Sequence, residues 1–302
     1  MRCRFRGGAG AVTPPRLCRH PSRAAQGWGT ANYCVMLAQG YLELLGIIDP
    51  SLFSNNLDRF LEGRGQGLLG IVLGTEETTA LAATLTARGL HPEGPLTLSR
   101  LLEAGAEPVE PIFSLLRLPP EELPAINGFF CQHLTPELLR QPGWEIHPNA
   151  VTGIASVTIA VDNPEAIAEA YETLLGRSAV VPTDDAWAVH LGDGSVLLFV
   201  TPEEAATLYS PLSGPPESPS IVAMALRSTN LEQTAAALTA NGVAFDSSPA
   251  RCCASRRSRR AVGCWSLLVR EVLSGRCPEP RPRGFGPLGN PLLIRRNEGM
   301  ID

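Results

Sequence analysis

The feature of this sequence that most constrains its fold is a unit that occurs three times. Each copy has an apolar run typical of a strand, then a segment of helical period, then a glycine suited to end a helix. The copies span residues 67–89 (GLLGIVLGTEETTALAATLTARG), 154–176 and 221–242. Asp162-Asn163 and Asn230 stand where a helix-capping side chain is expected. Three such units predict an internal repeat in an α+β fold.

A hairpin pattern also repeats. In residues 27–50 (GWGTANYCVMLAQGYLELLGIIDP), two apolar runs flank the turn signal Gln39-Gly40, and residues 187–202 (WAVHLGDGSVLLFVTP) are similar. We therefore expect modules with the order strand, helix, and a meander of about three strands. The meander of module two is expected in 111–135. Module three spans 154–202, and module four starts at 221 and loses its pattern after 249. Module one keeps only its meander.

Glu43 is the one charged residue in the second apolar run of the first hairpin, between Leu42 and Leu44. A buried carboxylate without a partner is costly or becomes protonated, so Glu43 is expected to reach solvent or to have a partner. Three roles stay open from the sequence: a metal ligand, a general base, or a hydrogen-bonded structural carboxylate.

Charge is distributed unevenly along the chain. All 25 basic residues are arginines; residues 43–250 hold 8 of them against 26 acids, and residues 251–302 hold 11 against 4. The acidic middle argues against nucleic acid as a partner, because phosphates need a positive surface. No apolar run is long enough for a membrane span. Cys34 and Cys131 show no disulfide or zinc spacing, so we expect a reduced, cytoplasmic protein.

Composition divides the chain into four segments. We expect an atypical or disordered start at 1–26, a first domain at 27–147, a second domain at 148–250, and an atypical Arg-, Cys- and Pro-rich tail at 251–302. Such ends are what a GC-rich coding region gives when it is translated out of frame, and a frameshift is one interpretation. A functional basic tail and, at the start, an organellar transit peptide are the alternatives.

Repeated βαβββ modules, paired two per domain, resemble the vicinal oxygen chelate superfamily, and within it the glyoxalase-like domain proteins. The matching text includes GTANYCVMLAQGYLELLGI, GLLGIVLGTEE, FFCQHLTPELLRQPGWEIHPNAVTG and VTIAVDNPEAIAEAYETLLG, and the resemblance covers roughly residues 27–250. It implies a fold of two glyoxalase/dioxygenase-like domains, with the first module incomplete. It also implies a divalent metal (Zn, Ni, Fe or Mn) held by a His on each first strand and a Glu on each last strand.

The resemblance transfers to only some residues of this chain. Glu43 matches the last-strand Glu of module one. The first-strand position of module two falls near Leu69 or Gly70, neither of which is a ligand. In module three Ser156 stands where His is expected. Aligning Gly194 with Gly40 also aligns Leu197 with Glu43, and Trp187 with Tyr33. The second domain is therefore expected to lack a metal set.

The remaining candidates lie near the end of the module-two meander. We expect Tyr33, Gln132 and His133 to contact a substrate, and Glu43 and His133 to hold a metal if one is bound. Cys131 is either a core residue or a nucleophile. A loop after these residues either rims a pocket or caps the link between domains, and contains Trp144, Glu145, His147 and Asn149.

The resemblance implies a metal-assisted lyase, isomerase or dioxygenase acting on a small oxygen-bearing metabolite, with Glu43 as the catalytic residue. A non-catalytic protein that binds or sequesters a small molecule on the same scaffold is the alternative, with Glu43 as a hydrogen-bond acceptor. A truncated, non-functional product is a third interpretation. The expected partners are a small-molecule ligand and a second copy of the chain in a homodimer, with no nucleic acid and no membrane.

Overall fold

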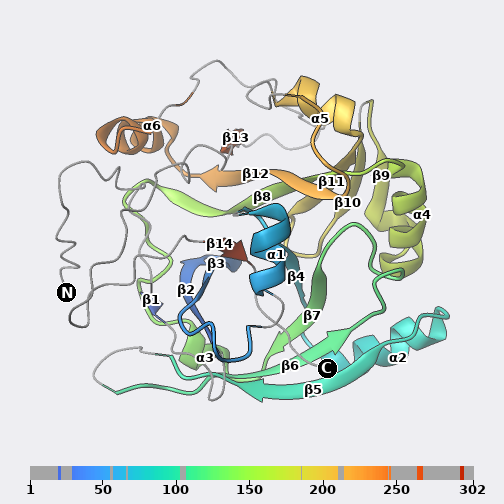
Figure 1. The fold of residues 1–302 in the computed structure, drawn as a ribbon, viewed down its shortest axis with the longest axis horizontal. Helices are drawn as coiled ribbons and strands as arrows, with labels where there is room; N and C mark the ends of the chain where they lie inside the picture. The colour runs from blue at the N-terminus through green and yellow to red at the C-terminus, as the bar shows by residue number, and fades with distance from the viewer. Residues whose placement is uncertain are drawn as a thin grey trace.

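The computed structural model describes residues 20–21, 29–54, 57–65, 67–102, 107–184, 186–209, 214–243, 245, 264–267 and 293–295. Its strands form three sheets, and helices pack against them in an α+β arrangement (Figure 1). The predictions for the start at 1–26 and the tail at 251–302 fall largely outside the described residues. Only the short strands β1 (His20–Pro21), β13 (Cys264–Leu267) and β14 (Leu293–Arg295) are described there.

Module two has the predicted βαβββ order. Its elements are β4 (Ile71–Gly74), α2 (Thr78–Ala87), β5 (Glu93–Ser99), β6 (Ile112–Arg117) and β7 (Gly128–His133). The sheet order is β4-β7-β6-β5, with β4 and β7 parallel and the other pairs antiparallel. The prediction placed the whole meander in 111–135, whereas its first strand is β5. Most side chains of β5 are exposed, so its sequence has no apolar pattern to reveal it.

Modules three and four share one sheet, with the strand order β13-β12-β8-β11-β10-β9. Module three consists of β8 (Val151–Ala160), α4 (Pro164–Leu175), a short 3₁₀ turn, β9 (Val180–Pro182), β10 (Trp187–His190) and β11 (Val196–Val200). Module four begins with β12 (Ser220–Ser228) and α6 (Leu231–Ala240). The first strands of the two modules, β8 and β12, pair antiparallel, which joins the modules edge to edge.

Capping side chains begin the helices where the sequence indicated. The Asn163 side chain accepts a hydrogen bond from the Ala166 N–H at 3.1 Å at the start of α4, and Asn230 accepts one from Gln233 at 3.0 Å at the start of α6. These bonds satisfy N–H groups that the first helical turn leaves without partners. Both predicted caps are confirmed. Two further helices, α3 (Pro136–Leu139) and α5 (Pro202–Leu208), follow the last strands of modules two and three.

The first hairpin consists of β2 (Thr30–Leu37) and β3 (Gly40–Ile47), as predicted. Its pairing closes at Leu37 and Gly40 and places Cys34 opposite Glu43. Gly40 has a φ of 138°, a backbone conformation that favours glycine at this tight turn. The short strands β1 and β14 pair with its outer edges, and α1 (Leu57–Arg64) follows it along the chain.

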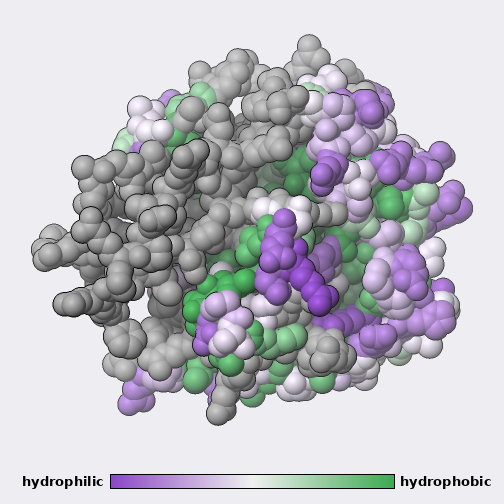
Figure 2. Space-filling view, in the orientation of Figure 1, coloured by the Kyte–Doolittle hydropathy of each residue, from purple (hydrophilic) through white to green (hydrophobic). Residues whose placement is uncertain are grey.

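Both faces of this hairpin are buried, because it lies between the sheet of module two and the sheet of modules three and four (Figure 1). Side chains alternate between the faces of a strand. Val35, Leu37, Leu42 and Leu44 join the large apolar core that also contains the α4 side of β8 and β11. Cys34, Met36 and Tyr41 instead pack with side chains of β4, β6 and β7. Figure 2 shows hydrophilic side chains gathered over α4 and α1 on the outer surface.

Candidate functional site

Glu43 lies at the interface between the first hairpin and the sheet of module two, and its side chain is completely buried. The amide Nδ2 of Asn32, on the neighbouring strand, donates a hydrogen bond to Glu43 Oε1. The guanidinium Nη1 of Arg100, which directly follows β5, lies 3.9 Å from the same oxygen, and the Arg100 side chain is only 11% exposed. Glu43 therefore faces a positive charge inside the protein and not bulk water.

Tyr41 lies two residues before Glu43 on β3 and therefore on the same face. Burial is the largest cause that raises the pKa of the Tyr41 phenol well above its ordinary value, and nearby Cys131, Glu43 and Cys34 add to it. Burial and then the Glu43 carboxylate raise the pKa of the Cys34 thiol. Both groups therefore stay protonated at neutral pH, which does not suit Cys34 to act as a nucleophile.

His133, at the end of β7, lies on the same face as this group. Its ring centroid is 5.8 Å from that of Tyr41 and 5.3 Å from that of Phe113, which it meets edge-on. Burial, followed by the charge of Arg140, lowers the pKa of His133 to about 4. The imidazole is thus neutral at pH 7. We refer to seven of these side chains as the hairpin cluster: Asn32, Cys34, Tyr41, Glu43, Arg100, Cys131 and His133.

Two predicted ligand-binding residues lie outside the hairpin cluster. Gln132 alternates with His133 and points to the other face of β7, where its Oε1 accepts hydrogen bonds from the N–H and hydroxyl of Thr78, at 3.1 and 3.0 Å. Its contact is therefore the start of α2. Tyr33 packs against the large apolar core on the opposite face of β2 from Asn32 and Cys34. The structure thus places Glu43 and His133 on the same buried face, with Tyr41 between them, and places Tyr33 and Gln132 on other faces.

Sequence reasoning did not identify Asn32 or Arg100. Asn32 directly precedes the first apolar run and lies within β2, and a polar residue at that position was an available signal. Arg100 lies 57 residues beyond Glu43 in a segment without a clear pattern. Arg100 directly follows β5, and its N–H donates to the Pro111 carbonyl at 3.2 Å. Only the folded course of β5 therefore brings Arg100 to Glu43.

The described residues do not fit a metal ion. Among them, no group of three or more His, Cys, Asp or Glu side chains is placed to hold one. Glu43 is engaged by Arg100 and Asn32. On β4 the residue that joins the cluster face is Val72, and not the Leu69 or Gly70 position expected from the sequence; none of the three is a ligand.

In module three the equivalent of Glu43 is Leu198, and the overlay that selected Leu197 was wrong by one residue. The closing bond of this hairpin joins the Leu191 N–H to the Ser195 carbonyl at 2.9 Å, so its loop is one residue longer than the turn before Gly40. Leu197 belongs to the apolar core beneath α4. Leu198 lies on the other face, paired with Thr158, whose hydroxyl contacts the Tyr209 hydroxyl at 2.7 Å.

The loop before β8 fastens the first hairpin to the start of module three. His147 is buried, and its Nε2 donates to the Met36 carbonyl at 2.6 Å. The Asn149 side chain accepts from the Val151 N–H at 3.3 Å. Trp144 packs at the margin of the apolar side chains around the hairpin cluster. These contacts hold the loop in place, and its role as a cap of the link between the domains stays a prediction.

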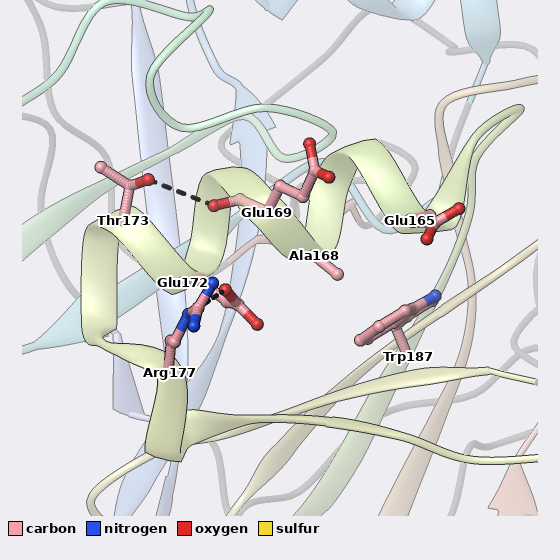
Figure 3. Close-up of a pocket in the computed structure, with 7 residues that line it drawn as sticks. All are labelled: Glu165, Ala168, Glu169, Glu172, Thr173, Arg177 and Trp187. Carbon is pink, nitrogen blue, oxygen red and sulfur yellow. Dashed lines mark hydrogen bonds and ion pairs between the residues drawn. The ribbon is translucent and has the colours of Figure 1, made fainter.

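A separate surface cleft of about 520 Å³ lies between α4 and β10 (Figure 3). Glu165 and Glu169 line the cleft from α4, and Trp187 lines it from β10. Glu172 is paired with Arg177 at 3.2 Å. The cleft shares no residue with the hairpin cluster.

The fold and the buried cluster together define a protein of paired βαβββ modules. The chain belongs to the glyoxalase-like domain family, because the model of that family matches residues 18–175, more than half of the chain. A model of the Glyoxalase/Bleomycin resistance protein/Dioxygenase superfamily matches residues 153–260. The resemblance inferred from the sequence is therefore confirmed.

Other comparisons bear on the fold alone. The crystal structure of a hypothetical protein from Staphylococcus aureus matches with a TM-score of 0.50 and 14% identity, over 61% of this chain and 77% of that one. No curated protein matches the chain. Within the described residues, no helix has both the length and the apolar character needed to cross a membrane.

Proposed function

We propose that this protein binds a small oxygen-bearing molecule at the hairpin cluster, with Glu43 as a hydrogen-bond acceptor and not as a metal ligand. The observation that carries the proposal is the complete burial of Glu43 beside Arg100 and Asn32. Burying an ion pair has a desolvation cost that its attraction often only offsets, so a buried pair is weak evidence of a stabilising role. A role in recognition gives these buried charges a purpose other than stability.

The protonation states of the side chains around Glu43 support ligand binding in which these side chains transfer no proton. The Cys34 thiol, the Tyr41 phenol and the His133 imidazole are neutral at pH 7 because burial shifts each pKa in the direction that disfavours its charged form. A ligand at this position meets a compensated ion pair surrounded by neutral side chains. Such a site suits a polar molecule held by directed hydrogen bonds.

Complete burial of Glu43 also sets how a ligand reaches it. The carboxylate has no exposed area, so hairpin and sheet must separate locally before a molecule can contact it. Binding that requires a conformational change has a lower association rate constant than docking to a preformed surface. Slow association is therefore part of the proposal.

The test compares wild type with Glu43→Gln in calorimetric titrations against small carbonyl, carboxylate and hydroxylated compounds. A hydrogen bond to a charged group contributes roughly 1.5–3 kcal/mol, so the affinity of a binding compound should fall by about tenfold or more. Glu172→Gln, on the surface of α4, is the control and should bind as wild type. Equal affinity of wild type and Glu43→Gln for every bound compound contradicts the proposal.

Metal analysis of the purified protein separates this proposal from metal-assisted catalysis. The proposal predicts that compound binding persists after chelation and dialysis. Stoichiometric Zn, Ni, Fe or Mn that is lost in Glu43→Gln would instead identify Glu43 as a ligand and overturn the binding role given to it here.

The setting proposed for this function is the cytoplasm, with the protein as a homodimer. Cys34 and Cys131 are both buried thiols outside any disulfide, which supports a reducing compartment. Sedimentation velocity at several concentrations tests the homodimer, and a single monomeric species would contradict it.

A further inference from the structure

Two buried oxygen atoms on β2 lack a hydrogen-bond partner within the part of the chain that the structure describes: the hydroxyl Oγ1 of Thr30 and the amide Oδ1 of Asn32, the residue that contacts Glu43. The two residues are 1% and 5% exposed. A buried polar atom without a partner costs roughly 1–3 kcal/mol, and native proteins contain few of them. Their presence next to the hairpin cluster therefore needs an explanation.

Both atoms belong to one row of side chains on β2. Thr30 and Asn32 are separated by two residues, so their side chains lie on the same face, about 7 Å apart along the strand. The Asn32 amide has a defined orientation, because its Nδ2 donates to Glu43 Oε1 and leaves Oδ1 as an acceptor. The row thus offers two hydrogen-bond acceptors.

The surroundings of the row are apolar. Leu45 pairs with Asn32 across the hairpin and packs with Leu57 of α1 and with Leu69. None of these three side chains carries a donor. Among the described residues, His147 Nδ1 is also a buried atom without a partner, but it belongs to the loop at the Met36 carbonyl and is outside this row.

The charge balance selects the kind of donor. Arg100 already lies opposite the Glu43 carboxylate, and Thr30 and Asn32 are neutral. An ammonium group at this row would bring a second positive charge into the interior, which is costly. Hydroxyl groups donate hydrogen bonds without that charge.

We propose that the ligand of the hairpin cluster is a neutral polyol, whose hydroxyl groups donate to Thr30 Oγ1 and Asn32 Oδ1. This inference rests on the proposed function and specifies its ligand class. A four-carbon polyol such as erythritol carries hydroxyls along a length comparable to the spacing of the two acceptors. Its hydroxyl groups satisfy both oxygens, and the one at Asn32 lies nearest to Glu43, which the Asn32 amide contacts.

The test uses Thr30→Val, Thr30→Ser and a matched control, Thr78→Val. Thr78 is also a buried threonine, but its hydroxyl contacts Ser114 Oγ at 2.7 Å and Gln132 Oε1 at 3.0 Å. Removing a hydroxyl that has no partner should leave the melting temperature unchanged or raise it, whereas removing the Thr78 hydroxyl should lower it. The two threonines are therefore expected to behave in opposite ways.

Erythritol and 1,4-butanediol, which lacks the internal hydroxyls, are the probes, and affinities are measured by saturation-transfer NMR titration. Erythritol should bind wild type, Thr30→Ser and Thr78→Val equally, and Thr30→Val about fivefold more weakly, as expected for the loss of one neutral hydrogen bond. 1,4-Butanediol should bind wild type at least tenfold more weakly than erythritol does.

Three results overturn the inference. One is equal erythritol affinity in wild type and Thr30→Val. Another is a loss of melting temperature in Thr30→Val as large as in Thr78→Val, which would mean that the Thr30 hydroxyl has a partner. The third is binding of non-hydroxylated compounds that depends on Glu43, without polyol binding; the proposed function then stands and only the ligand class is wrong. If no compound binds in a manner that depends on Glu43, both proposals fail.

Discussion

The hairpins β2–β3 and β10–β11 occupy equivalent places in their modules but differ in what they bury. On β3, Glu43 faces Arg100 in the interior, whereas the equivalent Leu198 on β11 is paired with Thr158. The backbone pattern is thus maintained by apolar alternation and tight turns in both places. The charged groups are additional to it, which indicates that the fold does not require them.

The largest expected effect on stability concerns the hairpin β10–β11, which buries no charged group at the position of Glu43. Phe199 is completely buried and packs against Tyr171, with ring centroids 5.0 Å apart. Phe199→Ala should lower the free energy of unfolding by about 4–5 kcal/mol, because it leaves a cavity in a packed core. Denaturant unfolding measures this loss. A loss below about 1 kcal/mol would mean that Phe199 of β11 is not packed in the apolar core as described here.

Removing the Glu43 charge from the hairpin β2–β3 should have the next largest effect on stability. Glu43→Ala takes away the carboxylate opposite Arg100, and removing one partner of a buried ion pair costs about 3–4 kcal/mol. The double variant Glu43→Leu with Arg100→Leu should recover most of this loss, since an apolar pair of similar volume avoids the desolvation cost. If the double variant is less stable than Glu43→Ala, the pair stabilises the fold and the contrast between the hairpins is wrong.

His133, which packs against Tyr41 of the first hairpin, should make the stability of the protein depend on pH. The ordinary His pKa is 6.5 and that of folded His133 is about 4, so the unfolded chain binds a proton between these values that the folded chain does not. Stability should therefore fall as pH decreases from 6.5 to 4, by up to about 3 kcal/mol. His133→Gln should remove this part of the pH dependence in urea unfolding curves.

The control for this prediction is His190→Gln, on the exposed side of β10. It should retain the wild-type pH dependence. Identical profiles for wild type and His133→Gln would show that His133 is not buried against Tyr41 and Phe113 as described.

The smallest expected effect concerns features that modules three and four share. Asn163→Ala and Asn230→Ala each remove a helix cap and should each cost about 1 kcal/mol. Similar values for both, measured by thermal unfolding, would confirm that the repeated units are equivalent at this level. A difference of more than about 1 kcal/mol would show that one cap is satisfied in another way.

The sequence predicted the parts of this molecule that depend on local pattern. Strand alternation, the Asn163 and Asn230 caps and the turn at Gln39-Gly40 each have a signal within a few residues, and all are confirmed. Strand β5 has mostly exposed side chains and no alternation, so it was missed. The overlay of Leu197 on Glu43 failed because loop length changes which face a residue occupies.

The candidate site was predicted less completely. Glu43 and His133 were identified because each interrupts or ends an apolar run. Arg100 reaches Glu43 through long-range pairing of β5 with β6, for which one sequence carries no local signal. The opposite orientations of Gln132 and His133 follow from alternation, but which face meets the hairpin depends on packing between modules.

The most direct measurement of ligand binding at Glu43 is a carbonyl-¹³C NMR titration with the glutamate side chains labelled. The Glu43 resonance is assigned by its absence from Glu43→Gln, and the best-binding small molecule is added to the wild-type protein. We predict that ligand binding changes the Glu43 carboxylate resonance, either by a progressive shift or by a second resonance that grows with ligand occupancy. A Glu43 resonance that neither moves nor is replaced while the ligand saturates the protein would contradict the proposed binding role.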